Sequence, residues 1–386
     1  MKVSIWSNSF AALSTNSASE YTLVLFDITI SSMAPAVKAI NKKELEYFVL
    51  SNMTNSHIQT VAVLSQYNAR SLNEHLNSAK WWNFGRKQGG LFLFTPTVTT
   101  NNSWWYRGTA DAIWQNIDFL KKRHEPYVII ASGDGVYKLD FNKVLDYHIS
   151  KQADITVVCA KLPEGDDVSR YGVVQLDREG RIVEFEEKPM VATSDLVSAG
   201  VYIIRRRALI DLLEECNREG RYNFVTDILI RYKSMKKLYG YKMDGYWSNI
   251  ADVDSYFKAN MDFLRKDVRD SFFHSEPGVY SKTHDLPPAK FNAGSKVINS
   301  LVAGGCIINS TVENSVLFKK AFVGNNSVVK NCVILNGAYI GDNVHVENCI
   351  VESHETLLSG STYIGENGIR IVTGNKNRYD MPVGEV

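Results

Sequence analysis

The sequence predicts two domains: an α/β domain with a mostly parallel, Rossmann-like sheet, followed by a left-handed parallel β-helix. Over the first two-thirds of the chain, short β-branched runs alternate with longer amphipathic stretches. Beyond residue 290, aliphatic residues recur every six positions. Alternating strands and helices favour a parallel sheet covered by helices, whereas a six-residue period is typical of a solenoid.

Four β-branched runs predict strands of the N-terminal sheet, at residues 61–64, 127–131, 155–158 and 201–204. A helical period of apolar residues between the first two predicts a helix over 109–120. Ligands of such sheets bind beyond the carboxyl ends of the strands. The residues directly after Ala131 are therefore the first place to look for a site.

A change of pattern near residue 265 predicts the domain boundary. The expected division is a domain over 1–265, a connector over 266–290, hexapeptide repeats over 291–370 and a tail over 371–386, with a helix-like run at 254–264. Within the repeats, an asparagine that precedes Ser or Cys and two aliphatic residues returns at Asn314, Asn331 and Asn348. Three hexapeptides form one triangular turn, so the aliphatic side chains stack inside a parallel β-helix.

Composition excludes several classes of protein. The 386 residues carry a formal net charge of +1, so no overall field attracts nucleic acid or anionic lipid. No apolar run approaches the ~20 residues that cross a bilayer, and the first residues do not resemble a secretory signal. Five dispersed cysteines without a Cys-x-x-Cys pair argue against a disulfide framework or a zinc site. We therefore expect a cytoplasmic protein without nucleic-acid or membrane partners.

A hexapeptide β-helix has two common uses. Many acyltransferases are solenoids of this kind with a histidine base, for which His345 and His354 are the candidates here. In other proteins the β-helix supports the oligomerisation or regulation of a catalytic domain ahead of it. The N-terminal domain decides between these uses.

Six phrases resemble one enzyme family in their order and spacing. They lie at residues 50–67, 105–112, 132–140, 184–189, 198–202 and 245–250. Together they resemble ADP-glucose pyrophosphorylase, the glucose-1-phosphate adenylyltransferase of glycogen and starch synthesis, over roughly residues 35–365. The resemblance implies a GT-A-like nucleotidyltransferase domain, and the C-terminal β-helix is also a feature of this family.

The resemblance also implies roles for individual residues. The family joins glucose 1-phosphate to ATP and releases pyrophosphate, using a glycine-rich loop that cradles the triphosphate, basic side chains, and two aspartates that hold Mg²⁺. By resemblance, Asp134 is the first metal aspartate, Lys188 contacts the glucose phosphate and Glu187 accepts a sugar hydroxyl. The family pattern places Ser198 and Tyr202 on the sugar-pocket strand, and Gln66, Trp105 and Tyr106 in loops near ATP. The residue types alone also fit a turn aspartate, a solvated lysine and aromatic side chains that only pack.

The sequence departs from the family pattern at the positions that are expected to bind the triphosphate and the metal. The glycine-rich loop is expected around residues 18–26, yet no glycine precedes Gly85. Ser32 and Ala34 replace basic residues, Thr226 replaces a lysine, and Asn249 stands where the family has its second metal aspartate. Because a hard cation prefers charged oxygen ligands, we expect Mg²⁺ binding to be weak or absent and independent turnover to be near zero.

These departures resemble the degenerate GlgD-type subunit that some bacteria pair with an active enzyme. The first hypothesis is therefore a regulatory subunit that assembles with a catalytic ADP-glucose pyrophosphorylase subunit in a heterotetramer and still binds glucose 1-phosphate or ATP. The second is a self-sufficient nucleotidyltransferase with an unusual phosphate loop. The third is a hexapeptide acyltransferase whose N-terminal domain only binds a nucleotide sugar.

Overall fold

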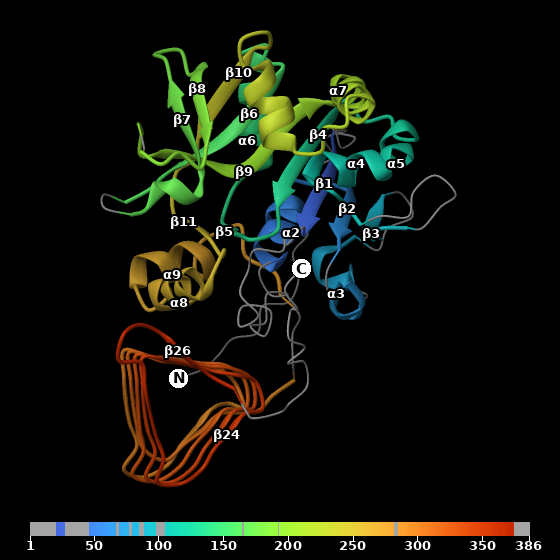
Figure 1. Cartoon of the computed structure of the whole chain (residues 1–386). Coiled ribbons are helices and arrows are strands. Elements are labelled where there is room, and N and C mark those ends of the chain that lie inside the picture. Colours follow the sequence, from blue (N-terminus) through green and yellow to red (C-terminus); the bar gives the residue numbers. More distant parts are fainter. Residues whose placement is uncertain are drawn as a thin grey trace, which may run out of the picture.

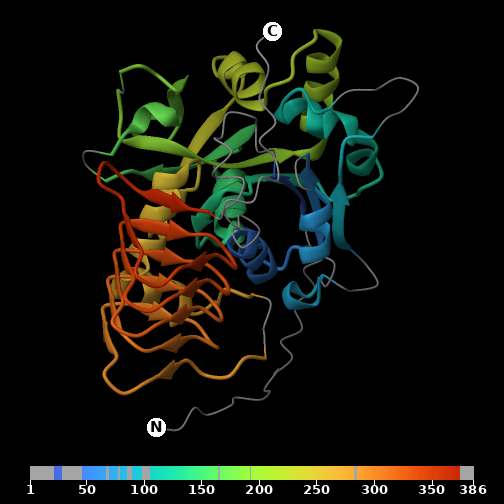
Figure 2. The same ribbon diagram turned by 60° about the horizontal axis from the view of Figure 1, so that its bottom comes forward.

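The computed structural model describes residues 21–27, 46–66, 69–76, 79–84, 89–97, 105–163, 166–191, 193–281 and 285–373. It confirms the predicted fold class. An α/β domain is followed by a triangular solenoid, and Figure 1 looks nearly along the axis of that solenoid. Figure 2 shows the coils stacked beside the α/β domain, with the last coil, in red, nearest to it.

The N-terminal domain is built on a nine-stranded, mostly parallel sheet. Its main path runs β10-β6-β9-β4-β1-β2-β3, and β9 is antiparallel to both of its neighbours on that path. The strands are β1 Tyr21–Asp27, β2 Thr60–Ser65, β3 Gly90–Phe94, β4 Tyr127–Ser132, β6 Ile155–Lys161, β9 Leu196–Arg205 and β10 Leu238–Lys242, with a side hairpin of β7 Gly172–Leu176 and β8 Ile182–Glu187. All four predicted strands are present. Their continuous apolar runs fit strands that are buried on both faces.

Strand β1 corrects one expectation. Residues 21–26, where the glycine-rich loop was expected, form a central strand that pairs in parallel with β2 and β4. The run Thr-Leu-Val-Leu-Phe is apolar and rich in strand-forming residues, so it is used in the sheet. Residues 18–20 and the segment 28–45, which includes Ser32 and Ala34, lie outside the described residues.

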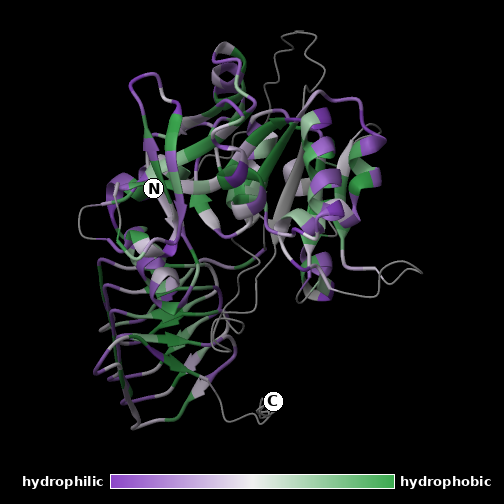
Figure 3. Cartoon of the chain, turned by 45° about the horizontal axis from the view of Figure 1, so that its top comes forward, coloured by the Kyte–Doolittle hydropathy of each residue, from purple (hydrophilic) through white to green (hydrophobic). Residues whose placement is uncertain are grey.

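Helices cover the sheet. The helix predicted over 109–120 is two helices, because the side chain of Asn116 donates to the carbonyl of Ala112 and to the hydroxyl of Tyr106 and interrupts the helical path. The helices of the domain are α2 Glu46–Asn55, α3 Ala69–Leu76, α4 Thr109–Gln115, α5 Ile117–Lys121, α6 Phe141–Ser150 and α7 Arg206–Arg218, together with a π-helix at Val225–Ile230. In Figure 3 the inner strands are largely hydrophobic and much of the outer surface of the helices is hydrophilic.

Two further helices lie between the sheet and the solenoid. Helix α8 is Val253–Asp262 and α9 is Lys266–Phe273. A capping box fixes the start of α8, since the Asp252 carboxylate accepts from the Ser255 N–H and the Ser255 hydroxyl accepts from the Asp252 N–H. The helix predicted at 254–264 is thus confirmed.

The solenoid consists of three five-stranded parallel sheets. The first holds β12 Lys290–Phe291, β15 Ile307–Ile308, β18 Phe322–Val323, β21 Tyr339–Ile340 and β24 Thr356–Leu357. The second holds β13 Lys296–Ile298, β16 Thr311–Glu313, β19 Val328–Lys330, β22 His345–Glu347 and β25 Thr362–Ile364. The third holds β14 Leu301–Val302, β17 Val316–Leu317, β20 Val333–Ile334, β23 Cys349–Val351 and β26 Arg370–Val372.

The repeat is explained by its interior and its corners. Val312, Val329 and Val346 pair in register and are fully buried, which confirms the predicted ladder. The recurring asparagines stand at corners with positive φ, 49° at Asn331 and 53° at Asn348. Asparagine tolerates this left-handed conformation better than most residues.

One hydrophobic cluster joins the two domains, and we call it the docking cluster. It combines Val136 and Ile250 of the α/β domain, Tyr256, Ala259, Val268 and Phe272 of α8 and α9, Val333 and Ile350 of the third solenoid sheet, and Leu335 just after β20. Phe272 is 1% exposed and contacts the rings of Phe48 and Phe263. The solenoid is therefore attached through a shared core.

We predict that Phe272→Ala destabilises the protein much more than Phe273→Ala. Removing the ring of Phe272 leaves a cavity in the docking cluster and costs roughly 3–5 kcal/mol, whereas the neighbouring Phe273 is 54% exposed. Thermal unfolding and limited proteolysis of the two variants provide the measurement. Equal loss of stability in both would contradict the assignment of Phe272 to the interdomain core.

Candidate functional site

Asp134 and Asn249 are brought together at the carboxyl end of the sheet. Asp134 lies in the turn between β4 and the short strand β5, Gly135–Tyr137, and β5 pairs antiparallel with β11, Trp247–Asn249. Asn249 is opposite Gly135, and the N–H of Ile250 donates to the carbonyl of Asp134 at 2.9 Å. Two positions that are 115 residues apart in the chain thus share one edge of this ladder.

The two side chains of this pair differ in charge. One oxygen of the Asp134 carboxylate accepts a hydrogen bond from the Ser132 hydroxyl at 2.5 Å, and Asn249 offers only a neutral amide. Among the described residues, no group of three or more His, Cys, Asp or Glu side chains could hold a metal ion. Mg²⁺ prefers charged oxygen ligands in octahedral geometry. The pair therefore offers this ion one charged oxygen ligand and one neutral one.

Glu187 and Lys188 lie at the end of the β7–β8 hairpin. Glu187 pairs with Gly172, where an added Cβ would approach the Glu187 Oε2 to 3.0 Å and the Phe185 ring to 2.6 Å. Lys188 is exposed, adopts a left-handed φ of 50°, and its N–H donates to the carbonyl of Tyr171. The backbone at Gly172 therefore packs directly against the Phe185 ring and the Glu187 carboxylate, with no space for a side chain.

Burial raises the pKa of the Glu187 carboxyl, and the neighbouring Lys188 ammonium partly offsets this shift. A raised pKa means that the surroundings of this carboxyl disfavour its charged form. Perturbed carboxyls of this kind are common at binding sites.

Ser198 and Tyr202 lie on β9 and contact each other. Their hydroxyl oxygens are 3.2 Å apart, and the N–H of Gly200 donates to the Ser198 hydroxyl. Burial raises the pKa of Tyr202, the Ser198 hydrogen bond lowers it, and the carboxylates of Glu187 and Asp134 raise it further. Tyr202 therefore lies within electrostatic reach of both Glu187 and Asp134.

Tyr171 and Trp247 also belong to this region, although the sequence interpretation did not single them out. Their rings meet edge to face with centroids 5.4 Å apart. The indole N–H of Trp247 is buried without a hydrogen-bond partner in the described part of the structure. Trp247 lies in the phrase at 245–250 without a role assigned to it, and Tyr171 lies outside all six phrases, so only the contact between the two rings places Tyr171 here.

The three residues expected near ATP have different surroundings. Gln66 follows β2 directly, and its buried Oε1 has no hydrogen-bond partner among the residues described. Trp105 is 59% exposed. Tyr106 lies in the core on one side of the sheet and accepts a hydrogen bond from Asn116.

The phrase that contains Tyr106 is held by a buried polar network. The Asp111 carboxylate is 2% exposed and accepts from the backbone N–H and the guanidinium of Arg107 and from the amide of Gln115. Every one of these bonds is local, because the partners lie four residues apart on the chain. These local hydrogen bonds give Arg107, Asp111 and Gln115 a structural role in the fold.

The two histidines of the solenoid lie on its outside. His345 is 3.3 Å from the Glu347 carboxylate, and His354 is exposed at a corner.

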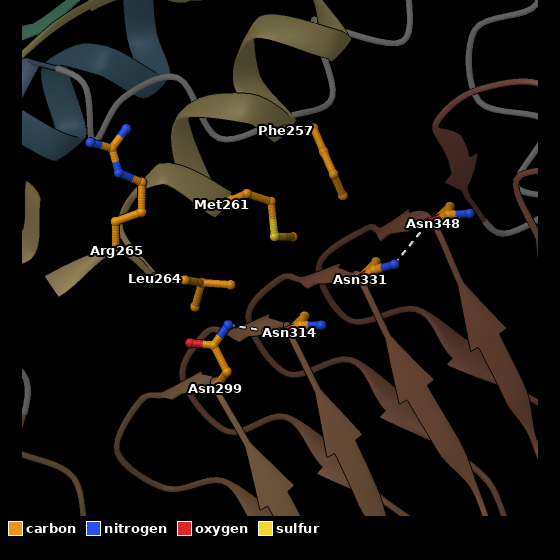
Figure 4. A pocket seen from close by; sticks show the side chains of 8 residues that line it. All are labelled: Phe257, Met261, Leu264, Arg265, Asn299, Asn314, Asn331 and Asn348. Atoms are coloured by element: carbon orange, nitrogen blue, oxygen red, sulfur yellow. Dashed lines mark hydrogen bonds between the residues drawn. The ribbon is translucent and has the colours of Figure 1, made fainter.

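A separate pocket of about 490 Å³ lies between α8 and the asparagine corners (Figure 4), lined by Phe257, Met261, Leu264, Arg265, Asn299, Asn314, Asn331 and Asn348. Neither histidine lines this pocket.

Comparison with known proteins identifies relatives of both domains. The family model described as nucleotidyl transferase matches residues 24–266, and the model described as GlmU-like, C-terminal hexapeptide matches residues 287–370. The chain is 37% identical to the glucose-1-phosphate adenylyltransferase of Pseudothermotoga lettingae over 76% of this chain and 70% of that protein. It is 35% identical to the protein of the same name in Geobacillus stearothermophilus over 78% of each chain, and 38% identical to that of Bacillus cytotoxicus over 76% of this chain and 78% of that protein.

Of the helices that the structure describes, none has the length and apolar character that a membrane span requires.

We predict that Glu187→Gln stabilises the protein at neutral pH. Because the folded pKa of Glu187 is raised above its ordinary value of 4.5, the native state gains from protonation, and this gain is lost as pH rises through the folded pKa. The variant should melt about 1–3 °C above the wild type at pH 7, and the difference should vanish at low pH, where both side chains are neutral. Thermal unfolding across pH measures it, with Glu186→Gln reporting the general effect of one lost charge. A destabilised Glu187→Gln protein at pH 7 would show that the charged carboxylate is structural.

Proposed function

Because this chain belongs to the glucose-1-phosphate adenylyltransferase family of nucleotidyl transferases, we propose that it is a subunit of ADP-glucose pyrophosphorylase that lacks substantial turnover of its own. In this proposal it assembles with an active homologous subunit, serves glycogen synthesis, and changes the activity of its partner. The observation that carries the proposal is the position of Asn249 beside Asp134. Asn249 pairs with Gly135 in the β5–β11 ladder, and the N–H of Ile250 donates to the carbonyl of Asp134.

The family pattern supplies two metal-binding carboxylates at this ladder, and this chain supplies only one, Asp134. A carboxylate at residue 249 would give two negative charges beside each other, and the amide leaves one. In-line transfer at a phosphate depends on alignment and on neutralisation of the phosphate charge. Loss of one well-placed group of this kind commonly costs ~3 kcal/mol of barrier, or about 10² in rate.

The segment after β1 supports the same conclusion. Residues 28–45 follow the central strand β1 and contain no glycine. A backbone that holds phosphate closely uses positive φ and lacks Cβ atoms, both of which glycine provides. This chain therefore lacks the residue type that a triphosphate cradle needs, in addition to the second carboxylate.

The sugar side of the site supports binding without chemistry. Glu187 and Lys188 lie at the end of β8, Ser198 and Tyr202 lie on β9 with their hydroxyls in contact, and β7 pairs with both strands. A subunit that still binds glucose 1-phosphate can favour one conformation of an assembly and so change its partner. This is the role we assign to the site.

We predict that the purified chain releases pyrophosphate from ATP and glucose 1-phosphate at less than about one-hundredth of the rate of an active homologue. Asn249→Asp alone should not restore turnover, because the segment after β1 still lacks glycine. Mixing the chain with an active homologous subunit should change the rate or the saturation curve of that subunit. A pyrophosphate-release assay measures all three.

The outcomes are distinct. Normal turnover by the isolated chain would favour a self-sufficient nucleotidyltransferase. Rescue by Asn249→Asp would show that the phosphate-binding segment is intact. No effect on any active homologue, together with dependence on an acyl donor, would favour an acyltransferase.

We also predict that Lys188→Ala weakens glucose 1-phosphate binding by about 10- to 100-fold, as expected for the loss of one hydrogen bond between charged groups. Isothermal titration calorimetry measures this without catalysis. The matched control is Lys161→Ala, since Lys161 is exposed at the end of β6 and pairs with Asp195 at 3.1 Å. An equal effect of both substitutions would remove Lys188 from the binding site.

A further inference from the structure

The pocket between α8 and the solenoid has two walls of different chemistry (Figure 4). Its solenoid wall is a column of corner asparagines from four successive coils: Asn299, Asn314, Asn331 and Asn348. The opposite wall is apolar, because Phe257, Met261 and Leu264 are spaced four and three residues apart and so share one face at α8 and its C-terminal end. Amide groups therefore face hydrocarbon across the pocket.

The asparagine column is interrupted in the middle. The Asn299 amide donates to the Oδ1 of Asn314 at 2.7 Å, and the Asn331 amide donates to the Oδ1 of Asn348 at 3.4 Å. No hydrogen bond joins Asn314 to Asn331 within the described residues, and Figure 4 shows the same gap. The Nδ2 of Asn314 is thus a donor and the Oδ1 of Asn331 an acceptor that no other described residue satisfies.

One hydroxyl group fits this gap. A hydroxyl oxygen can accept a hydrogen bond from one amide and donate its own proton to the next. Two such bonds of about 2.8–2.9 Å that meet at a roughly tetrahedral angle span about 4.7 Å. Neighbouring parallel strands lie about 4.8 Å apart. A single hydroxyl between Asn314 and Asn331 therefore completes the column without any movement of the backbone.

The charges around the pocket disfavour an anionic ligand. Among the described residues, Arg265 is the one charged side chain in the lining. It pairs with Asp267 at 2.6 Å and lies 4.0 Å from Asp262, and in Figure 4 its guanidinium points away from the asparagines. This lining therefore offers a phosphate or a carboxylate no cation that is not already paired, and it suits a neutral ligand.

We propose that this pocket binds a neutral sugar, with one ring hydroxyl between Asn314 and Asn331 and the C–H face of the ring against Phe257 and Met261. A sugar carries several hydroxyls around an apolar ring face, so it matches one amide wall and one apolar wall. The volume of about 490 Å³ lies in the range of small-molecule sites. The pocket is separate from the candidate site at Asp134 and Glu187, and the inference does not depend on the proposed function.

A sugar in this pocket contacts both domains at once. Phe257 and Met261 pack against the docking cluster, and the asparagines belong to the solenoid. A ligand that binds both walls favours the docked arrangement over a separated one by mass action. The pocket is therefore a place where a sugar can stabilise the contact between the two domains.

Methyl NMR of the full chain, labelled with carbon-13 at its methionine methyl groups, tests the proposal. Met261 lines the pocket, so its resonance, assigned with Met261→Leu, should move on titration with glucose and report a dissociation constant of about 1–10 mM. The resonance of Met53, which is fully buried in the core of the α/β domain, should stay in place. A Met261 resonance that does not respond up to about 50 mM glucose would overturn the proposal.

Glycine substitutions test the asparagine gap. Asn314→Gly and Asn331→Gly should each weaken glucose binding at least about fivefold, because glycine keeps the positive φ of these corners, 45° and 49°, and removes only the amide. The matched control is Asn343→Gly, the same change at an exposed corner with a φ of 56° that does not line the pocket, and it should leave binding unchanged. Equal affinity in all three variants would contradict the assignment.

Two further ligands define the source of the sugar. Maltotriose that binds more tightly than glucose would support the proposal with a unit of a glucan chain as the ligand, whereas equal affinity would support it with a free sugar. Triglycine offers backbone amides instead of hydroxyls. A Met261 resonance that moves with triglycine and not with either sugar would overturn the proposal in favour of a peptide.

Discussion

The burial of aromatic and aliphatic side chains in the docking cluster is the interaction on which the rest of the molecule depends. Within this cluster, Val136 lies two residues after Asp134 and Ile250 lies next to Asn249. Val333 of the same cluster belongs to the solenoid. Lys138, just beyond β5, donates to the carbonyls of Ser271 and Ser275 at the end of α9. Close-packed interiors shift as units rather than deform gradually. The candidate site and the solenoid therefore share one core, and a structural change at either one reaches the other through direct contact.

Under the proposed function, the site keeps the residues of the sugar side and lacks part of the phosphate and metal side. The fold tolerates this loss because its stability comes from elsewhere. Asp111 and its partners Arg107 and Gln115 satisfy one another inside the domain, and the Asn249 backbone pairs with Gly135 whatever its side chain carries. An Asp-to-Asn difference at residue 249 removes one charge without disturbing the ladder. The same backbone can thus carry different side-chain chemistry at this position in different chains.

The solenoid shows a similar separation between fold and function. Its interior is set by stacked aliphatic residues such as Val329 and Val346, and its corners by asparagines with positive φ. The outward positions are free of both constraints, so each sheet carries its own chemistry. One sheet packs on α8 and α9, one presents the Lys330–Glu347 pair, and one presents the Phe322–Tyr339 stack. Contacts with other subunits can therefore evolve on a solenoid without changing its core.

The sequence by itself determined the elements whose signal is local. The six-residue period specified the solenoid, because each coil buries the residues that recur at that spacing, and β-branched runs specified the four predicted strands. It also identified Asp134 and Asn249 as separate positions. Only the tertiary structure decided that residues 21–27 form a central strand rather than a loop, that Asn116 divides the helix over 109–120, and that Asp134 and Asn249 share one ladder. These features depend on partners far along the chain or on competing side-chain hydrogen bonds. A periodic pattern cannot encode them, because it reports only which face of an element is buried and not what buries it.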